Sequence, residues 1–317
     1  MKPDSVSILR FAADLDALVP AGERIGVAVS GGPDSLALLL LATAARPGLI
    51  EAATVDHGLR DGSRAEAAMV ASLCERLGVP HRILPADWAE PPTANIQAEA
   101  RTMRYRLLTE WAEERALPAL ATAHHADDQA ETLLMRLARG AGVRGLGGTR
   151  PRRALTGQVA LVRPLLGWRK SELVSIVNAA GIEAVDDPSN RDPRHDRSRI
   201  RQALERADWA DPARLAASAS ALRDADEALD WALAPLITAR LKRDGQVLII
   251  EPFDLPLELR RRLVLAAFAE LGEAAPRGPD LMRALSALDA GQKVTLGGLK
   301  LEGGEKWRLS SAPQRRR

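Results

Sequence analysis

Short apolar runs alternate with helix-length segments as far as about residue 140. Residues 24–29, 49–56, 81–85 and 118–123 have the apolar and β-branched character of buried strands, and each is followed by a segment with helical character. Strands that alternate with helices form a parallel sheet that helices cover on both faces. The sequence therefore predicts an α/β fold with a doubly wound, mainly parallel sheet.

The composition of the chain changes after this alternating part. Residues 140–153 are rich in Gly and Arg and are expected to form a surface loop. From residue 211 a long helical stretch, interrupted by Pro235, precedes short strands and two further helices. The strands are expected at 246–251, 292–296, 299–302 and 305–309, and the helices at 256–272 and 278–288. We expect one α/β domain over residues 1–210, and a helical linker with a smaller α+β domain over 211–317.

Composition excludes several classes of protein. Hydrophobic residues make up 46% and charged residues 27% of the chain, as in globular proteins. No run approaches the ~20 apolar residues of a membrane span, so we expect no membrane association and a cytoplasmic location. Cys74 is the single cysteine, which excludes an intrachain disulfide and a metal site made of cysteines alone.

Positive charge is unevenly distributed although the net charge is only +2. Residues 139–171 carry eight cations and no Asp or Glu, and residues 191–206 carry six arginines against three acids. Such local asymmetry attracts a polyanion such as RNA. A solvated arginine-rich surface is the alternative explanation.

A glycine-rich loop connects the first predicted strand to its helix. Two glycines let the backbone bend so that its N–H groups approach an anion, and the helix N-terminus adds a positive dipole end. Ser30 and Ser35 can donate hydroxyl hydrogen bonds, whereas the Asp34 carboxylate beside a polyphosphate needs a bridging cation, for which Mg²⁺ is suited. The predicted phosphate loop is Ser30, Gly31, Gly32, Pro33, Asp34 and Ser35.

Two other interpretations of this loop fit less well. A Walker A loop requires GxxxxGK[ST], which the chain does not contain. A serine nucleophile at Ser30 would need a Gly-x-Ser-x-Gly elbow, but Ala28 stands at its first position. A hydrolase would also need a downstream acid followed by a histidine.

The string SGGPDS resembles the pyrophosphatase loop of the N-type ATP pyrophosphatase superfamily, whose fold is of the adenine nucleotide alpha hydrolase type. Its members cleave ATP between the α and β phosphates and transfer AMP to an acceptor oxygen. The resemblance implies that the domain over residues 1–210 is an ATP-pyrophosphatase catalytic domain.

Four further segments resemble the tRNA(Ile)-lysidine synthase family. They are EARTMRYRLL with Arg101, Arg104 and Tyr105, HHADDQAET at 124–132, RPLL at 163–166, and DDPSNRDPRHDRSRIR at 186–201. The family resemblance implies adenylation of C2 of the wobble cytidine in the CAU anticodon of tRNA(Ile). L-Lysine then displaces AMP to give lysidine. The smaller domain over 211–317 would bind tRNA or substrate.

The resemblance also implies roles for particular side chains. Asp128 and Glu131 are spaced i, i+3 on a predicted helix, so both carboxylates point the same way, and they would hold the lysine. Asp127 has the simpler role of a helix N-terminal carboxylate. Arg104, with Arg101 one turn away, would stabilise charge at the α-phosphate, and Arg101 would also contact substrate.

Further candidates lie at the other strand ends. Asp56 and His57 would line the nucleotide site at the end of the second strand. His124 and His125 would also line this site rather than bind a metal, because adjacent histidines do not converge on one ion. Near the acceptor base the resemblance places the polar side chains of the 186–201 segment. These are Asn190, Arg197, Arg199 and Arg201.

Two rival functions remain at this stage. A tRNA thiolase of the same superfamily relies on paired cysteines, which a chain with Cys74 alone does not supply. A tRNA-binding protein without catalytic activity would not need the ATP loop. The sequence is compatible with a homodimer, and it leaves open which group deprotonates the lysine.

Overall fold

The computed structural model describes residues 2–58, 62–88, 96–185 and 196–312. The chain divides into two compact units, Met1–Arg223 and Asp224–Arg317. This division lies inside helix α9 (Pro212–Arg240), whereas the sequence analysis placed the whole of that helix in the second domain. Each unit is described by itself below.

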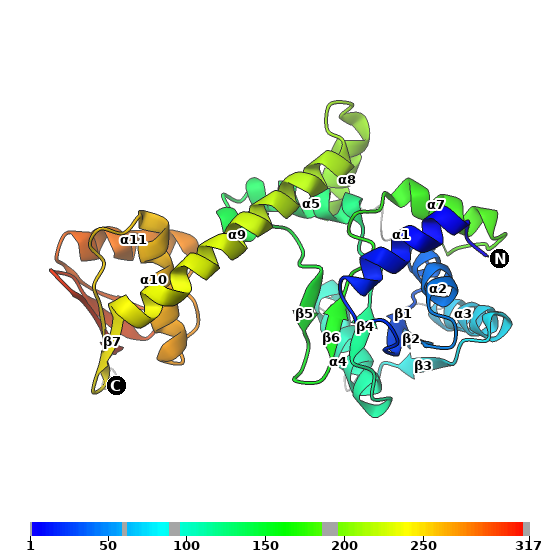
Figure 1. Ribbon diagram of the computed structural model, residues 1–317, viewed down its shortest axis with the longest axis horizontal. Coiled ribbons are helices and arrows are strands. Elements are labelled where there is room, and N and C mark those ends of the chain that lie inside the picture. Colours follow the sequence, from blue (N-terminus) through cyan, green and yellow to red (C-terminus); the bar gives the residue numbers. More distant parts are fainter. Residues whose placement is uncertain (1, 59–61, 89–95, 186–195, 313–317) are drawn as a thin grey trace. The chain divides into compact units, whose positions relative to one another are not determined.

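The first unit is built on a mainly parallel sheet (Figure 1). Among the described residues its strand order is β3-β2-β1-β4-β6-β5, and every pairing is parallel except that of β5 with β6. The strands are β1 (Ile25–Ala28), β2 (Ile50–Asp56), β3 (His81–Pro85), β4 (Ala119–Ala121), β5 (Arg152–Ala154) and β6 (Ala160–Val162). The predicted doubly wound α/β fold is confirmed. Strand β5, within the segment expected to be a loop, was not predicted.

Helices cover both faces of this sheet (Figure 1). On one face, side chains from four helices pack against the inward side chains of β1, and this core includes Phe11, Leu15, Leu73 and Val177. The helices are α1 (Ser5–Asp16), α2 (Pro33–Ala45), α3 (Ser63–Leu77) and α7 (Lys170–Ala179). Helix α2 is buried over eight consecutive residues because its sequence is apolar all round.

The opposite face is covered by α4 (Ile96–Glu114), which packs Leu108 and Trp111 against β2 and β4. Trp111 lies directly over Gly26 of β1. A Cβ added to Gly26 would lie 2.8 Å from Cζ3 of Trp111, so the glycine permits this close approach of α4 to the sheet. The helix is thereby held with its N-terminal half beside the carboxyl ends of the strands.

The strand order places a topological switch point beside β1. The chain proceeds from β1 to β2 and β3 on one side and then crosses to β4 on the other side. Ligands of open α/β sheets bind at such a point, outside the carboxyl ends of the strands. The three polar segments that follow β1, β2 and β4 therefore lie at one edge, as the sequence predicted.

The second unit holds an antiparallel sheet, as predicted for the smaller α+β domain. Its described strands have the order β7-β8-β11-β10-β9 and pack against α10 (Leu257–Glu270) and α11 (Gly278–Asp289). They are β7 (Leu241–Asp244), β8 (Val247–Ile250), β9 (Lys293–Leu296), β10 (Leu299–Glu302) and β11 (Trp307–Ser311).

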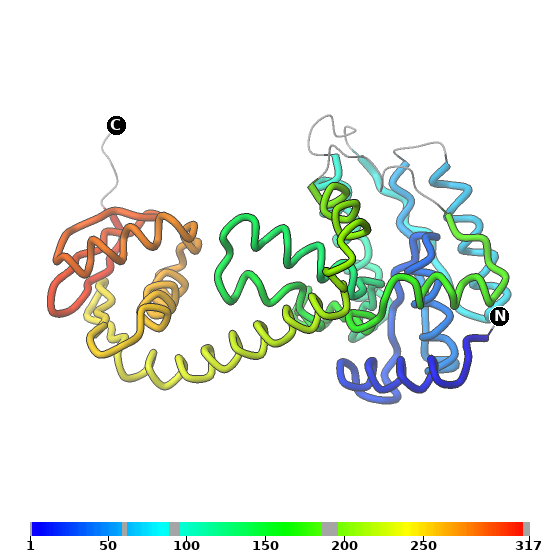
Figure 2. The backbone as a smooth tube through the Cα atoms, turned by 90° about the horizontal axis from the view of Figure 1, so that it is seen from above, coloured from blue at the N-terminus to red at the C-terminus, as the bar shows by residue number. Residues whose placement is uncertain are grey.

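Two details of the predicted elements were wrong. Pro235 lies inside α9 and does not interrupt it, and Figure 2 shows the helix as one continuous element. Proline removes one N–H donor from the helix, yet α9 continues on both sides of Pro235. Residues 241–243, which were expected to continue the long helix, belong to β7 because they pair with β8.

Candidate active site

The phosphate loop forms a closed turn at the N-terminus of α2. The Ser35 hydroxyl accepts from Ser30 N at 3.0 Å and donates to the Gly32 carbonyl at 2.9 Å. Gly31 has a φ of +82°, and its carbonyl accepts from Val185 N at 3.0 Å. This positive φ explains the glycine, and Pro33 at the first turn matches the fixed φ of a helix start. The predicted loop thus lies at the N-terminus of α2, where the helix dipole favours an anion.

Asp34 and His125 meet between the first turns of α2 and α5 (Ala126–Leu137). Oδ2 of Asp34 lies 3.5 Å from Nε2 of His125, while its Oδ1 is buried without a hydrogen-bond partner. A buried carboxylate oxygen with no donor fits a cation that phosphate oxygens and water would complete. Across the described residues no cluster of three or more His, Cys, Asp or Glu side chains could hold a metal ion by itself.

The His125 imidazole is buried among acids. Burial by itself would lower its pKa, but the carboxylates of Asp127, Asp34 and Asp128 outweigh burial and raise the pKa to about 10. The surrounding carboxylates therefore favour the protonated form of His125. Its backbone N–H also donates to Oδ2 of Asp128 at 3.0 Å, which fixes the start of α5.

Asp127 points away from the other acids of α5. It accepts from the backbone N–H of Lys170 at 2.9 Å and lies 3.5 Å from Nε of Arg169. Burial would raise the pKa of Asp127, but the His125 imidazole and the Lys170 N–H lower it to about 2. Asp127 thus stabilises the N-terminus of α7, a structural role like the one expected for it.

Asp128 and Glu131 lie on one side of α5 and share a guanidinium. Arg197 contacts Oδ1 of Asp128 through Nη2 and Oε2 of Glu131 through Nε, both at 2.5 Å. Arg201 contacts Oε1 of Glu131 through Nε at 2.6 Å. Both arginines come from α8 (Asp196–Arg206). The structure therefore brings Arg197 and Arg201 onto the two carboxylates assigned to lysine, a pairing that the sequence analysis did not foresee.

The remaining residues of the 186–201 segment are placed differently. Arg199 pairs with Asp196 on the exposed side of α8, away from Glu131. Asn190 lies outside the described residues.

His57 and Arg104 meet at the end of β2. Nη2 of Arg104 lies 3.3 Å from Nε2 of His57, and the His57 carbonyl accepts from Nε1 of Trp88 at 2.8 Å. Asp56 accepts from the Ser63 hydroxyl at 2.6 Å and from Gly58 N at 3.0 Å, so it stabilises the local turn. Trp88 was not predicted, because a tryptophan after an edge strand carries no motif of its own.

His124 follows the end of β4 and is partly buried. Its Nδ1 lies 3.1 Å from Oγ1 of Thr122. Burial lowers the pKa of His124 to about 4, although Asp128 opposes the shift. The two adjacent histidines therefore differ in charge at neutral pH, because only His125 is surrounded by carboxylates.

Comparisons with known proteins decide the family. Residues 5–207 match the model of the PP-loop domain. A tRNA(Ile)-lysidine synthase from Novosphingobium aromaticivorans is 49% identical over 311 residues, which cover 97% of this chain and 94% of that protein. One from Zymomonas mobilis subsp. mobilis is 45% identical over 302 residues, covering 94% of this chain and 91% of that protein. The chain belongs to the tRNA(Ile)-lysidine synthase family.

Membership in the tRNA(Ile)-lysidine synthase family makes the chain a ligase, and its PP-loop domain makes it an ATP-using one. The relatives' names give no support to the thiolase alternative or to a binding protein without activity. A U34-tRNA thiolase from Methanococcus maripaludis does superpose with a TM-score of 0.57, over 72% of this chain and 81% of that one. At 16% identity, however, that likeness shows the shared fold alone.

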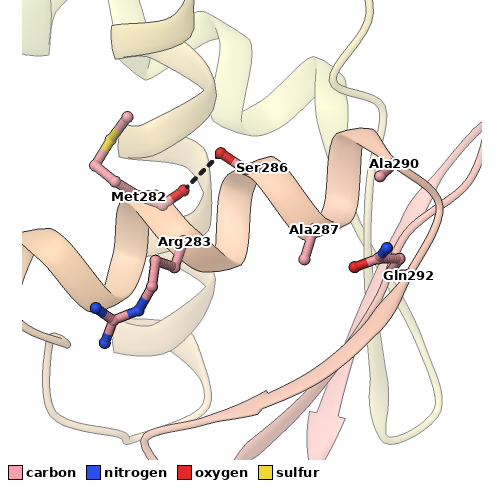
Figure 3. Close-up of a pocket in the computed structure, with 6 residues that line it drawn as sticks. All are labelled: Met282, Arg283, Ser286, Ala287, Ala290 and Gln292. Carbon is pink, nitrogen blue, oxygen red and sulfur yellow. Dashed lines mark hydrogen bonds between the residues drawn. The ribbon is translucent and has the colours of Figure 1, made fainter.

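A groove of the second unit lies along α11. A shallow groove along α11 is lined by Met282, Arg283, Ser286, Ala287, Ala290 and Gln292 (Figure 3). The Ser286 hydroxyl donates a hydrogen bond to the Met282 carbonyl at 3.1 Å (Figure 3). Arg283 is the one charged side chain among these lining residues. Among the described helices, none is long and apolar enough to cross a membrane.

Proposed function

We propose that the chain joins L-lysine to C2 of the wobble cytidine in the CAU anticodon of an isoleucine tRNA. ATP is converted to AMP and diphosphate, and the product base is lysidine. The relatives' printed name, tRNA(Ile)-lysidine synthase, supports this substrate. The observation that carries the proposal is the pair Asp128 and Glu131, which already bind a cationic side chain at the edge that also holds the phosphate loop.

In the first half-reaction the cytidine C2 oxygen attacks the α-phosphate and diphosphate leaves. The loop backbone and the Ser30 and Ser35 hydroxyls would hold the phosphates at the N-terminus of α2. Asp34 would hold Mg²⁺, which neutralises phosphate charge, through its unpartnered Oδ1. Arg104 would stabilise negative charge that develops on the α-phosphate.

In the second half-reaction the lysine ε-amine attacks C2, AMP leaves, and the amine loses a proton. The free ammonium has a pKa of ~10.4, so the site must bind the cation and then accept its proton. Asp128 and Glu131 would bind the ammonium in the place that the guanidinium of Arg197 takes in this structure. Lysine binding therefore requires Arg197 to move off at least one carboxylate.

Incubation with ATP, labelled lysine and an unmodified isoleucine tRNA transcript with a CAU anticodon tests the proposal. We expect label to enter the tRNA only when ATP is present, with one AMP released for each lysine incorporated. A transcript whose anticodon begins with U instead of C is the matched control and should remain unlabelled. Folded protein that releases no AMP and incorporates no lysine with the CAU transcript would contradict the proposal.

A further inference from the structure

Three arginines surround Tyr105, the single tyrosine of the chain, near the carboxyl ends of the strands of the first unit. Arg101 donates to the Tyr105 hydroxyl at 3.3 Å and lies 5.0 Å from the ring centroid, and Arg153 lies 5.8 Å from the same centroid. Arg163, directly after β6, lies near enough to Tyr105 for the two side chains to interact electrostatically. We call Arg101, Tyr105, Arg153 and Arg163 the Tyr105 cluster.

Arg163 is the buried member of the Tyr105 cluster. It is 5% exposed, and its Nη1 donates to the Arg150 carbonyl at 2.6 Å. Its Nε is buried and has no hydrogen-bond partner. A buried guanidinium N–H without an acceptor is destabilising unless a ligand supplies one.

The Tyr105 cluster contains no compensating acid. In the described parts of the chain, neither Arg101, Arg153 nor Arg163 forms an ion pair with a carboxylate. Burial lowers the pKa of Arg163, and after the opposing effect of Tyr105 the neighbouring Arg153 and Arg101 lower it further. Like charges that are held together in this way attract an anion.

The position of the Tyr105 cluster separates it from the phosphate loop. Strand β4 lies between β1, which leads into the loop, and β6, which leads into Arg163. Neighbouring strands are ~4.8 Å apart, so the two strand ends are on the order of 10 Å apart. Arg101 and Arg153 are exposed, so the cluster opens to solvent and a chain that continues past the site could reach it.

We propose that Arg101, Arg153 and Arg163 bind a backbone phosphate of the substrate RNA next to the nucleotide that is modified. The inference rests on the proposed function for the identity of the RNA. Tyr105 positions the guanidinium groups through its ring and its hydroxyl. The anion is a phosphodiester, because the triphosphate has its own loop and a nucleic acid brings a phosphate at every nucleotide.

Two substitutions and one control test this assignment in the full-length protein. Arg153→Ala removes an exposed cation. Arg163→Met removes the buried cation and replaces it with an unbranched apolar side chain. The control Arg76→Ala removes an exposed arginine near the end of α3, at the opposite edge of the sheet. Affinity for the CAU transcript is measured by filter binding at several salt concentrations, together with steady-state kinetics and thermal unfolding.

We expect each cluster variant to raise the Kd and KM for the transcript about tenfold, as for loss of a charge-assisted hydrogen bond. The slope of log Kd against log salt should become shallower by about one for each removed phosphate contact. The KM for ATP and inhibition by inorganic diphosphate should stay at the wild-type level. Arg76→Ala should match the wild type in every measurement.

Three results would overturn the assignment. One is a transcript Kd and salt slope for Arg153→Ala equal to those of Arg76→Ala. Another is a raised KM for ATP, or weaker inhibition by diphosphate, with unchanged transcript binding, which would assign the cluster to the nucleotide or to released diphosphate. The third is loss of transcript affinity only in variants that also fail to fold. Because binding is measured without lysine, failure of the wild type to form lysidine contradicts the proposed function separately.

Discussion

At the scale of single residues, the site depends on unequal partners for chemically similar groups. Asp127 and Asp128 are adjacent, yet the first is held by the start of α7 and the second by Arg197. His124 and His125 are adjacent, yet one has a pKa of about 4 and the other of about 10. The type of a residue alone therefore does not assign its role, because the neighbours that set the charge of its side chain come from other elements of the fold.

Asp34→Ala should abolish AMP formation, because the phosphate loop would lose its only carboxylate and with it the anchor for Mg²⁺. We expect a fall in kcat of at least ~100-fold, the usual range for loss of a charge-stabilising group. Diphosphate release measures this step. Asp16→Ala, which affects an acid of α1 that pairs with Arg46, is the control and should retain diphosphate release. Wild-type diphosphate release by Asp34→Ala would exclude the metal role.

Glu131→Gln should raise the KM for lysine more than the KM for ATP. The amide keeps the shape of the side chain but loses the charge that would attract the ε-ammonium, and we expect a rise of about tenfold or more in lysine KM. Steady-state kinetics with each substrate varied in turn give the two values. Equal effects on lysine and ATP would count against the lysine role of Glu131.

At the scale of elements, helices are fixed by buried charge as well as by apolar packing. Arg262 of α10 is 2% exposed and contacts Asp226 at 2.5 Å and Asp230 at 2.6 Å, both on α9, and Glu258 at 2.8 Å. Its charge is thus paired on three sides. The contact holds the C-terminal part of α9 against α10 within the second unit.

Arg262→Ala should lower the free energy of unfolding of the second unit by about 3–5 kcal/mol, because it leaves the buried Asp226 carboxylate without this partner. Its chain neighbour provides a matched control. Arg261 pairs with Glu258 at 2.7 Å but is partly exposed, so Arg261→Ala should change stability by about 0–1 kcal/mol. Urea unfolding monitored by circular dichroism compares the two variants. Equal losses of stability would show that burial of Arg262 has no special importance.

At the scale of the whole molecule, the predicted active-site residues belong to the first unit, and a second unit with its own core follows in the chain. The described residues of the two cores around the parallel sheet all precede Arg223, and the core of the second unit begins at Leu233. The predicted active-site residues that the structure describes lie in the first unit as well. We propose that the second unit binds RNA, as the family resemblance implies.

A fragment of residues 1–223 should fold and bind ATP with a Kd within about threefold of the full chain, because its cores are complete. Lysidine formation should fall at least ~10-fold through a raised KM for tRNA, since contacts from the second unit would be lost. Equilibrium binding of ATP and kinetics with varied tRNA distinguish the two effects. A folded fragment with unchanged tRNA kinetics would contradict the RNA-binding role of residues 224–317.

The local sequence was sufficient to predict most of the strands and helices and the glycine-rich loop. Periodicity located the parallel strands, since burial on both faces demands continuous apolar runs, and Gly31 with its positive φ is readable from SGGPDS. It was insufficient at Pro235, because α9 continues through the proline. It also missed β5, a short edge strand that forms only by pairing with β6.

The sequence by itself determined the alternation of the parallel strands with helices, the glycine-rich loop over residues 30–35, and the i, i+3 placement of Asp128 and Glu131. These properties depend on residues close together in the chain. Only the tertiary structure decided that Arg197 and Arg201 lie on those carboxylates, and that Arg153 and Arg163 gather around Tyr105. Such pairs join residues tens of positions apart, and their energies arise only when the sheet order and the helix packing bring the charges together.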